Sequence, residues 1–503
     1  MNGHKEEGLF VRCQALVRDA LLAFFGSEGL FLLAAFISAA VLSSDLLGWY
    51  REQTDAVYSF VVVPWGMALC LRRLQLRAGS VQRTHADVTA LFVLFVWLVV
   101  PFAVRFGATR NNMSAWVGYA TMYFGVYASV SEQQGEGRQR KMALTSGLFA
   151  LLAVIWGGAL LACVATGTQY GVDFGGTVFG VSEGYLYAGL HYNITGMIAL
   201  SLCGMCWLSM AGTKNAALRA LYAIPMLMNM VVIILTQSRT SRYAMLFALA
   251  VGAFDGVRRA LQRRGGLVSV LAALACAAVV LLGGFEACNG VTIAALRHYE
   301  QLPGSAQAVS FDAAVTGETA QTEEAPQTTE EAVQTEKTEE TEEMGEAAQA
   351  EVTTRAAVDS TFSDRTSIWK NVLKLWQQEP KLMLIGNGVG RTGSKIVEGT
   401  IHEANGAVSV HNTYLQWAAD FGLIGFALQL VFLTIALRQT IRVFFSAKRQ
   451  PGALALCMCV ASALAVGMME STTLGDMTPT NLVFMYALAQ LSAMSRENEP
   501  SSI

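Results

Sequence analysis

Residues 266–285 read GLVSVLAALACAAVVLLGGF, a run of small and aliphatic side chains without a charge. A helix of about 20 apolar residues is long enough to cross a hydrocarbon core about 30 Å thick. Similar runs recur on both sides of this one, separated by short polar segments. The sequence therefore predicts an all-α membrane protein with many spans.

Twelve spans account for these runs. We expect them at about 29–48, 56–72, 88–105, 113–130, 143–166, 189–211, 217–237, 242–257, 266–285, 412–437, 451–470 and 479–495.

The composition of the chain agrees with many membrane spans. Of 503 residues, 53% are hydrophobic and only 15% are charged, against roughly 25% charged in soluble domains. Cys203 and Cys206 form a C-x-x-C pattern inside an apolar run, where small packing residues are a better interpretation than a redox pair. The sequence gives no sign of a disulfide framework.

Basic residues orient the expected helices. Taking the N-terminus as cytoplasmic, the loops on that side contain most of the arginines and lysines outside the long loop, including Arg72, Arg73, Arg138, Arg258 and Arg438. An excess of Lys and Arg marks cytoplasmic loops. Both termini are then inside and the long loop at 286–411 is outside. This basic charge reflects topology and gives no reason to expect nucleic acid as a partner.

The chain divides accordingly into five parts. They are an interfacial or cytoplasmic N-terminus with an amphipathic stretch (1–28), nine spans (29–285), the large extracytoplasmic loop (286–411), three spans (412–495) and a cytoplasmic tail (496–503).

The large loop contains two different kinds of sequence. Residues 313–357 are rich in Glu, Thr, Ala and Gln and have no aromatic residue, so we expect a disordered, solvated spacer. Residues 363–410 are expected to be ordered. Ser363 or Asp364 can cap a helix with apolar residues at helical spacing, Pro380 ends that helix, and a glycine-rich turn follows at 386–390. Those glycines favour a close approach of the backbone to the site.

Arginines and one histidine at membrane boundaries are the candidate functional residues. Arg239 and Arg242 lie on the outer side, where the orientation rule disfavours them, and are three apart on one helix face if the helix begins at Ser238. A guanidinium binds phosphate well because its donors match two oxygens at once. Snorkelling, a salt bridge or contact with a lipid headgroup is the structural alternative.

His411, followed by Asn412, stands where the long loop meets the tenth span. Near neutral pH an imidazole can accept a proton from a sugar hydroxyl. The alternative is a hydrogen-bonded interfacial histidine without a catalytic role.

Three ordered motifs resemble the O-antigen ligase/polymerase family of membrane glycosyltransferases, most clearly over about 185–440. They are Ser238-Arg239-Thr240, with Thr in place of the usual Gly; Arg365-x-x-x-Trp369 followed by Gly386-x-Gly388-x-Gly390; and His411-Asn412 followed by Gly422-x-x-Gly425. The resemblance implies a GT-C-like fold with one large extracytoplasmic loop, in the cytoplasmic (inner) membrane of a bacterium.

The resemblance also implies a reaction in cell-surface polysaccharide or cell-wall biosynthesis. A glycan would pass from undecaprenyl diphosphate to the hydroxyl of a glycan or lipid acceptor, without metal or cofactor. Arg239 and Arg365 would hold the diphosphate, and His411 would orient or deprotonate the acceptor. The lesser candidates for substrate binding are Asn193, Arg242, Arg391 and Asn412. One departure from the family is that residues 167–188 contain no Arg or Lys.

Two other functions compete with transfer. A transporter or flippase of lipid-linked sugars also fits twelve spans, but transporters usually place charges near the midplane and show related halves. Asp255 and Glu470 fall near span ends, where a solvated position is expected. A non-catalytic scaffold that displays the acidic loop is the third hypothesis.

Overall fold

The computed structural model describes residues 24–42, 58–78, 85–105, 116–171, 178–182, 185–262, 266–300, 360–388, 410–447, 449–470 and 477–498. Two expected features therefore lie outside the described residues, the acidic insert at 313–357 and nearly all of the N-terminal amphipathic stretch.

Helices make up most of the described chain, and one small sheet interrupts them. The helices are α2 (Glu28–Leu42), η2 (Tyr58–Val62), α4 (Val63–Ala78), α5 (Ala86–Arg105), η3 (Thr121–Ala128), α7 (Ser129–Ser131), α8 (Gly135–Thr166), α9 (Tyr192–Gly212), α10 (Ala216–Leu235), α11 (Arg239–Ala260), α12 (Gly266–Glu300), α15 (Ser360–Gln378), α16 (Pro380–Ile385), α18 (Thr413–Phe445), α19 (Ala453–Met469) and α20 (Pro479–Glu497). The antiparallel sheet has the order β1 (Tyr170–Gly171), β2 (Val178–Ser182) and β3 (Tyr185–Ala188).

Five helices in the described part of the chain are long and apolar enough to cross a membrane: α8, α9, α10, α12 and α18. Shorter apolar helices occur within α2, α5 and α19. Each of the twelve expected ranges overlaps a helix, and the number of helices that cross the bilayer stays a prediction. Several boundaries differ: α8 begins at Gly135 and not at 143, α12 continues past 285 to Glu300, and α18 continues past 437 to Phe445. The expected cap of α15 is wrong, because this helix begins at Ser360 and contains Ser363 and Asp364.

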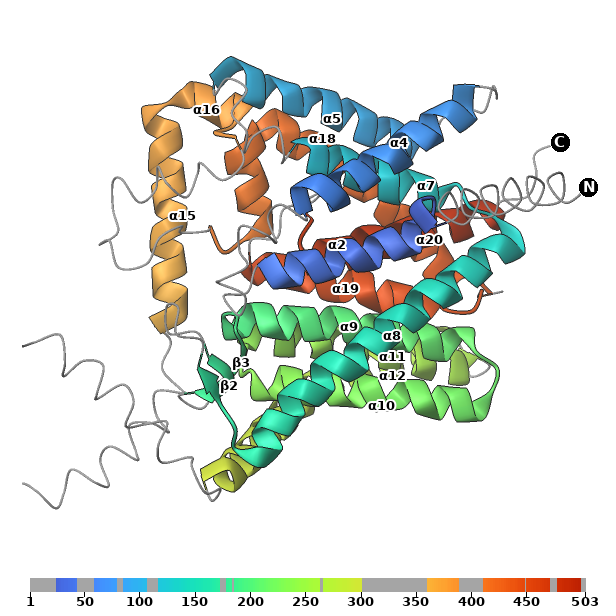
Figure 1. Cartoon of the computed structure of the whole chain (residues 1–503), viewed down its shortest axis with the longest axis vertical. Helices are drawn as coiled ribbons and strands as arrows, with labels where there is room; N and C mark the ends of the chain where they lie inside the picture. Colours follow the sequence, from blue (N-terminus) through green and yellow to red (C-terminus); the bar gives the residue numbers. More distant parts are fainter. Residues whose placement is uncertain are drawn as a thin grey trace, which may run out of the picture.

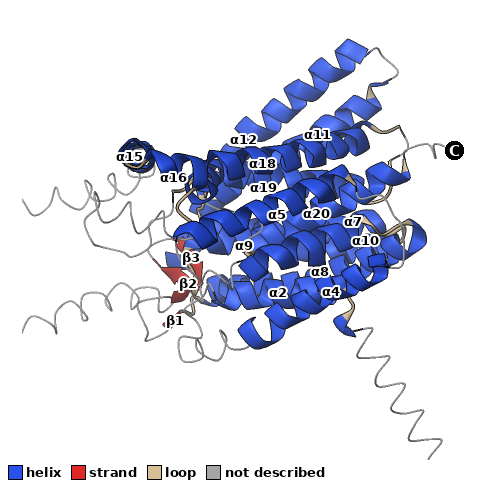
Figure 2. Cartoon of the chain, turned by 90° about the horizontal axis from the view of Figure 1, so that it is seen from above, coloured by secondary structure: helices blue, strands red, loops and turns tan. Residues whose placement is uncertain are grey.

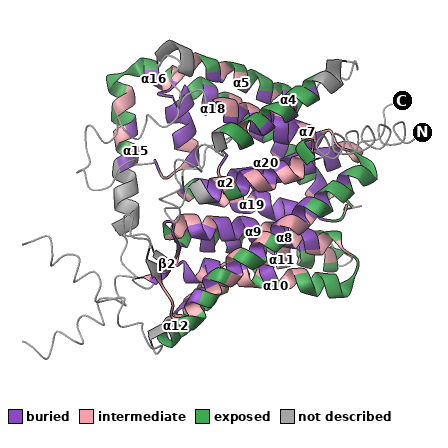
Figure 3. Ribbon diagram, in the orientation of Figure 1, coloured by how far each residue is buried: buried purple, intermediate pink, exposed green. Residues whose placement is uncertain are grey.

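Side-chain burial follows the layers of the bundle. Buried residues face the interior and exposed ones the periphery (Figure 3). Many exposed side chains are large and apolar, including Phe60, Leu267 and Leu282. Such a surface suits lipid, because a bilayer solvates apolar side chains while helices satisfy their own backbone groups. The surface supports the prediction of an integral membrane protein.

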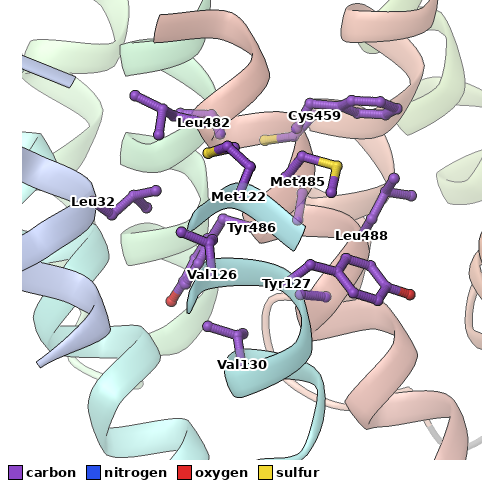
Figure 4. Close-up of a cluster of buried hydrophobic side chains, with 14 of the residues drawn as sticks. Leu32, Met122, Val126, Tyr127, Val130, Cys459, Leu482, Met485, Tyr486 and Leu488 are labelled. Atoms are coloured by element: carbon purple, nitrogen blue, oxygen red, sulfur yellow. The ribbon is translucent and has the colours of Figure 1, made fainter. Parts of the chain in front are cut away.

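The last helix lies at the centre of the largest core. Every residue of α20 from Pro479 to Ser495 is buried, as expected for a helix with neighbours on all sides. Figure 4 shows Met485 and Leu488 of α20 beside Met122 and Tyr127 of η3. A second core lies between α9, α10, α11 and the sheet.

The two ends of the bundle differ. Figures 1 and 2 place α15, α16 and the strands together at one end. Buried ion pairs gather at the ends of helices on the other side, where Asp255 accepts two 2.6 Å hydrogen bonds from Arg449 and Asp87 accepts others from Arg496. Asp255 is only 2% exposed, so the expectation that it is solvated is wrong. Its carboxylate can be buried because Arg449, Arg258 and Arg259 surround it with hydrogen-bond donors.

Helix α18 bends at Gly422, where φ is 71° and ψ is 173°. The bend frees three carbonyl groups that a straight helix would pair internally. The carbonyl of Ala419 accepts from the backbone N–H of Asn387 at 2.9 Å, and that of Asp420 from Gly388 at 2.8 Å. The third carbonyl, of Phe421, accepts from the Trp97 indole at 3.1 Å. The bend and the glycine turn thus form one unit.

Glycine is required on both sides of this contact. A Cβ on Gly422 would lie 2.1 Å from the Leu384 oxygen, and a Cβ on Gly386 would lie 2.2 Å from the Asp420 oxygen. Both residues also have positive φ. The glycine turn makes a close backbone approach, but to the backbone of α18, and its approach to the functional site stays a prediction.

We predict that Gly422→Ala destabilises the protein by more than about 2 kcal/mol, because it combines a backbone clash with an unfavourable φ. Thermal unfolding in detergent measures the effect as a drop of several degrees in Tm. The control is Gly256→Ala in α11, where a Cβ meets nothing within 4 Å; it should leave Tm unchanged or raise it. Equal melting of Gly422→Ala and the wild type would contradict this account of the bend.

Candidate functional site

The start of α18 is joined to the end of α19. Asn412 caps α18, its side-chain oxygen accepting from the backbone N–H of Leu415 at 3.0 Å. Its amide nitrogen donates to the Met468 carbonyl at 3.1 Å, and the Thr413 hydroxyl donates to the Glu470 carbonyl at 2.7 Å. Asn412 and Thr413 therefore set the position of the residue before them, His411.

Val410, on the other side of His411, is held by two side chains. Its carbonyl accepts from the Trp369 indole of α15 at 3.0 Å. Its N–H donates to the side-chain oxygen of Gln416 at 3.1 Å, and the Gln416 amide donates to buried Asp420 at 2.8 Å. Trp369, from the second sequence motif, and Gln416 thus hold Val410 from its carbonyl side and its N–H side.

His411 adopts a left-handed backbone conformation, with φ of 50°. Such a conformation costs of order 1–3 kcal/mol and persists where the surroundings impose it. The contacts of Val410 and Asn412 impose it here. Its Nδ1 lies 3.1 Å from Oε2 of Glu470, and the His411 side chain is 37% exposed against 10% for Glu470. The imidazole is therefore fixed on one edge and accessible elsewhere.

Glu470 joins three separate elements through one carboxylate. Besides His411, it accepts from the Asn193 amide of α9 at 3.1 Å and from the Thr240 hydroxyl of α11 at 3.4 Å, both at Oε1. The residue is 7% exposed, so the expectation of a solvated position is wrong. A buried carboxylate needs such donors to offset the loss of water. Sequence reasoning missed this residue because its partners are far away in the chain.

A second histidine lies beside the same carboxylate. His191 caps α9, its Nδ1 accepting from the Asn193 backbone N–H at 3.3 Å. Burial lowers the pKa of the His191 imidazole, and the nearby Glu470 carboxylate opposes this shift. Asn193, a residue predicted for the site, contacts both His191 and Glu470.

Arg239 is exposed and is the first residue of α11. The predicted start of this helix is confirmed: Ser238 is the cap and accepts from the backbone N–H of Ser241 at 3.2 Å. A cation in the first turn of a helix opposes the helix dipole, so Arg239 is not placed there for helix stability. It directly precedes Thr240, which contacts Glu470.

Arg242 is buried, whereas Arg239 is exposed. The expectation that both side chains lie on one helix face and bind phosphate there is therefore wrong. Arg242 is 5% exposed. Its guanidinium donates to the Ile234 carbonyl at the end of α10, to Asn289 at 3.3 Å and to Thr292 at 2.6 Å on α12. The cation lies at the C-terminal end of α10, where the helix dipole favours positive charge, and the Ile234 carbonyl accepts from the Gln237 backbone N–H as well. The contacts of Arg242 join α10, α11 and α12.

The remaining predicted arginines come from the long segment between α12 and α18. Arg365 lies on α15, one helical turn before Trp369, and its side chain is outside the described part. Arg391 lies outside the described residues altogether. The structure thus brings together His411, Asn412, Asn193, Thr240 and Glu470. It also places α15, the helix that carries Arg365, in contact with Val410, the residue before His411.

The arrangement supports acid–base chemistry. In the tautomer that donates its Nδ1–H to Glu470, His411 keeps the ring lone pair on Nε2, and this nitrogen is then the one that can accept a proton. Within the described residues, no group of three or more His, Cys, Asp or Glu side chains is placed to hold a metal ion. Cys203 and Cys206 are buried and unbridged in α9, in agreement with packing residues.

We predict that Trp369→Phe loosens the segment around His411. The change removes one hydrogen bond, worth roughly 1 kcal/mol, and keeps an aromatic ring. Hydrogen exchange in peptides covering 410–416 should quicken by about fivefold, the rate equivalent of that energy. The control is Trp376→Phe on the same helix, because the buried Trp376 indole nitrogen has no acceptor in the described part of the structure. Equal exchange in both variants would contradict a positioning role for Trp369.

Comparison with known proteins gives one family. Residues 221–430 match the family model described as O-antigen ligase. The matched range includes Arg239, Arg365 and His411, and excludes Asn193 and Glu470. A search of curated proteins found no match to this chain. The match supports a multi-pass membrane protein of the O-antigen ligase/polymerase type that acts in polysaccharide biosynthesis.

Proposed function

We propose, because residues 221–430 match the O-antigen ligase family model, that the protein transfers a glycan from undecaprenyl diphosphate to an acceptor hydroxyl. The acceptor is a growing glycan or a lipid-linked glycan. In this proposal twelve helices cross the inner membrane of a bacterium, both termini are cytoplasmic, and the end of the bundle with α15 and the strands faces outward.

The observation that carries the proposal is the pair His411–Glu470. A half-exposed imidazole touches a buried carboxylate at 3.1 Å, and the helix next to it begins with exposed Arg239. Glycan transfer from a diphosphate needs a general base to take the acceptor proton and a cation to stabilise the leaving diphosphate.

The proposed step is a displacement at the anomeric carbon. Nε2 of His411 takes the proton of the acceptor hydroxyl as its oxygen attacks, and the new glycosidic bond forms. The bond from the anomeric carbon to the diphosphate oxygen breaks, and the diphosphate leaves with the electron pair. Arg239 and Arg365 bind the diphosphate and stabilise its growing charge. The leaving group is supplied by the donor itself, so the step calls for no nucleotide.

Glu470 acts through His411 in this scheme. Its carboxylate favours the Nδ1–H tautomer and stabilises the imidazolium that forms. Asn193 and Thr240 hold the carboxylate, and Asn412 holds the start of α18, so these residues are positioning residues. The contacts of Arg242 support the same kind of role. Arg391 stays a candidate for the diphosphate.

The position of buried charge favours transfer over transport. In the described chain, buried charged side chains such as Arg138, Arg242, Asp255 and Glu470 lie near helix ends, and Asp420 lies at the bend of α18. A transporter would be expected to use charges or broken helices near the midplane. A scaffold that only displays the acidic insert would have no use for a strained His411 against a buried carboxylate.

We predict that His411→Ala abolishes polymer extension or attachment, a loss of about 10²–10⁴-fold in rate, because the general base is gone. Lipid-linked oligosaccharide should accumulate on the outer leaflet, measured by extraction and leaflet-selective labelling. The matched control is His298→Ala, which removes an exposed histidine near the end of α12 and should leave polymer unchanged. Normal polymer in His411→Ala would reject the enzyme, and accumulation on the inner leaflet would indicate a flippase.

We predict that Glu470→Gln lowers kcat by about 10–100-fold, a range typical of the loss of a partner that orients a catalytic group. KM should change little, because Glu470 does not contact substrate in this scheme. The assay uses purified protein in detergent with lipid-linked donor, and Glu286→Gln, at an exposed position on α12, is the control. A selective rise in KM with unchanged kcat would show that Glu470 serves binding instead.

A further inference from the structure

Three tyrosines gather beside the start of α9. Tyr185 and Tyr187 are on β3, and Tyr192 is the first residue of the helix. Tyr185 and Tyr192 stack with ring centroids 4.7 Å apart, Tyr187 meets Tyr192 edge-on at 6.0 Å, and the His191 ring lies 4.1 Å from that of Tyr192. We call Tyr185, Tyr187 and Tyr192 the tyrosine cluster.

The strand has two unlike faces. Leu186 and Ala188 are buried in the core between α9, α10 and α11, whereas Tyr185 and Tyr187 are half-buried on the opposite face. The antiparallel register, with Val181 opposite Leu186, keeps that division. A strand needs only its apolar face to attach to the core. The tyrosines on the other face pack on Tyr192 and stay half-buried, so part of each ring remains accessible.

The tyrosine cluster adjoins the His411–Glu470 pair. Asn193 directly follows Tyr192 and donates to Glu470 at 3.1 Å. His191 directly precedes Tyr192, and its Nδ1 accepts from the backbone N–H of the same Asn193 at 3.3 Å. A molecule bound on the tyrosine cluster would therefore lie next to the proton-accepting imidazole.

The chemistry of this segment suits sugar and not phosphate. Residues 167–188 contain no Lys or Arg, and their only charged residues are Asp173 and Glu183. This segment therefore contributes no cation of its own to bind an anion. Tyrosine instead offers a flat apolar ring with a hydroxyl at its edge. The C–H face of a pyranose ring packs on such a surface while its hydroxyls form hydrogen bonds.

We propose that the tyrosine cluster is a glycan subsite, which holds a sugar ring near the reacting unit by stacking. This inference rests on the proposed function for the identity of the chain that it binds. The bound ring belongs either to the donor glycan or to the acceptor glycan, and the two share the same ring chemistry.

Saturation-transfer NMR tests the subsite without catalysis. The probe is a lipid-free oligosaccharide released by mild acid from the surface polysaccharide of the cells that make the protein, and the receptor is the full chain in detergent. Irradiation of aromatic protons should transfer signal to sugar C–H protons in the wild type. The double variant Tyr185→Ala/Tyr187→Ala should weaken binding about tenfold, the range expected for the loss of two stacking rings.

Two further variants separate stacking from damage to the fold. Tyr185→Phe/Tyr187→Phe keeps both rings and should retain binding within about threefold, because it removes only hydrogen bonds at the ring edge. Tyr243→Ala removes a ring that stacks on Phe285 at 5.0 Å in α11 and α12, away from the cluster, and should bind normally. Equal loss in the Phe and Ala double variants would overturn a stacking subsite.

The outcomes distinguish this inference from the proposed function. Absence of transfer in the wild type, full binding by the Ala double variant, or displacement of the oligosaccharide by millimolar inorganic pyrophosphate would overturn the subsite. A His411→Ala protein that binds oligosaccharide normally but makes no polymer supports both proposals. Lost binding in the Ala double variant together with normal polymer in His411→Ala would support the subsite and reject the enzyme. Selective elevation of the donor KM or the acceptor KM in the Ala double variant identifies the bound chain.

Discussion

The buried carboxylate of Glu470 is the interaction on which the candidate site depends. It lies at the end of α19 and accepts hydrogen bonds from α9 and α11, while its second oxygen contacts His411. Removing a charged carboxylate from water costs several kcal/mol unless donors replace the water. Asn193, Thr240 and His411 supply those donors, so the energy that keeps Glu470 buried also holds three helices in one arrangement.

A second constraint on the same histidine comes from α15 and α16, which precede it in the chain. The bend of α18 at Gly422 leaves carbonyl groups that the turn after α16 pairs through Asn387 and Gly388. Unpaired backbone groups are costly inside a protein and more so within a membrane. The bend therefore needs α16, and α15 in turn holds Val410 through Trp369. This chain of contacts explains why motifs far apart in sequence, on α15, the glycine turn and α18, occur together.

The sequence predicted the elements that local rules control. Apolar runs predicted helices, Ser238 predicted the start of α11, Pro380 predicted the break between α15 and α16, and the glycines predicted a close backbone contact. Partners across helices were beyond those rules. Glu470 and Asp255 seemed solvated because each is a single acid near the end of an apolar run, and Arg242 seemed available because its acceptors on α10 and α12 are set by packing. A lone charge next to an apolar run, with no neighbouring counter-charge, is the signal that could have pointed to a buried pair.

The most direct test of this account is a double-mutant cycle between His411 and Glu470, measured as kcat/KM for transfer from a lipid-linked donor. Groups that act as one unit give strongly non-additive losses. The account predicts that Glu470→Ala lowers kcat/KM markedly in the wild-type background and has little further effect once His411 is alanine. Independent losses would contradict the claim that Glu470 works through His411. In that case kcat/KM of the double variant would fall below that of His411→Ala by the same factor by which Glu470→Ala lowers the wild-type kcat/KM.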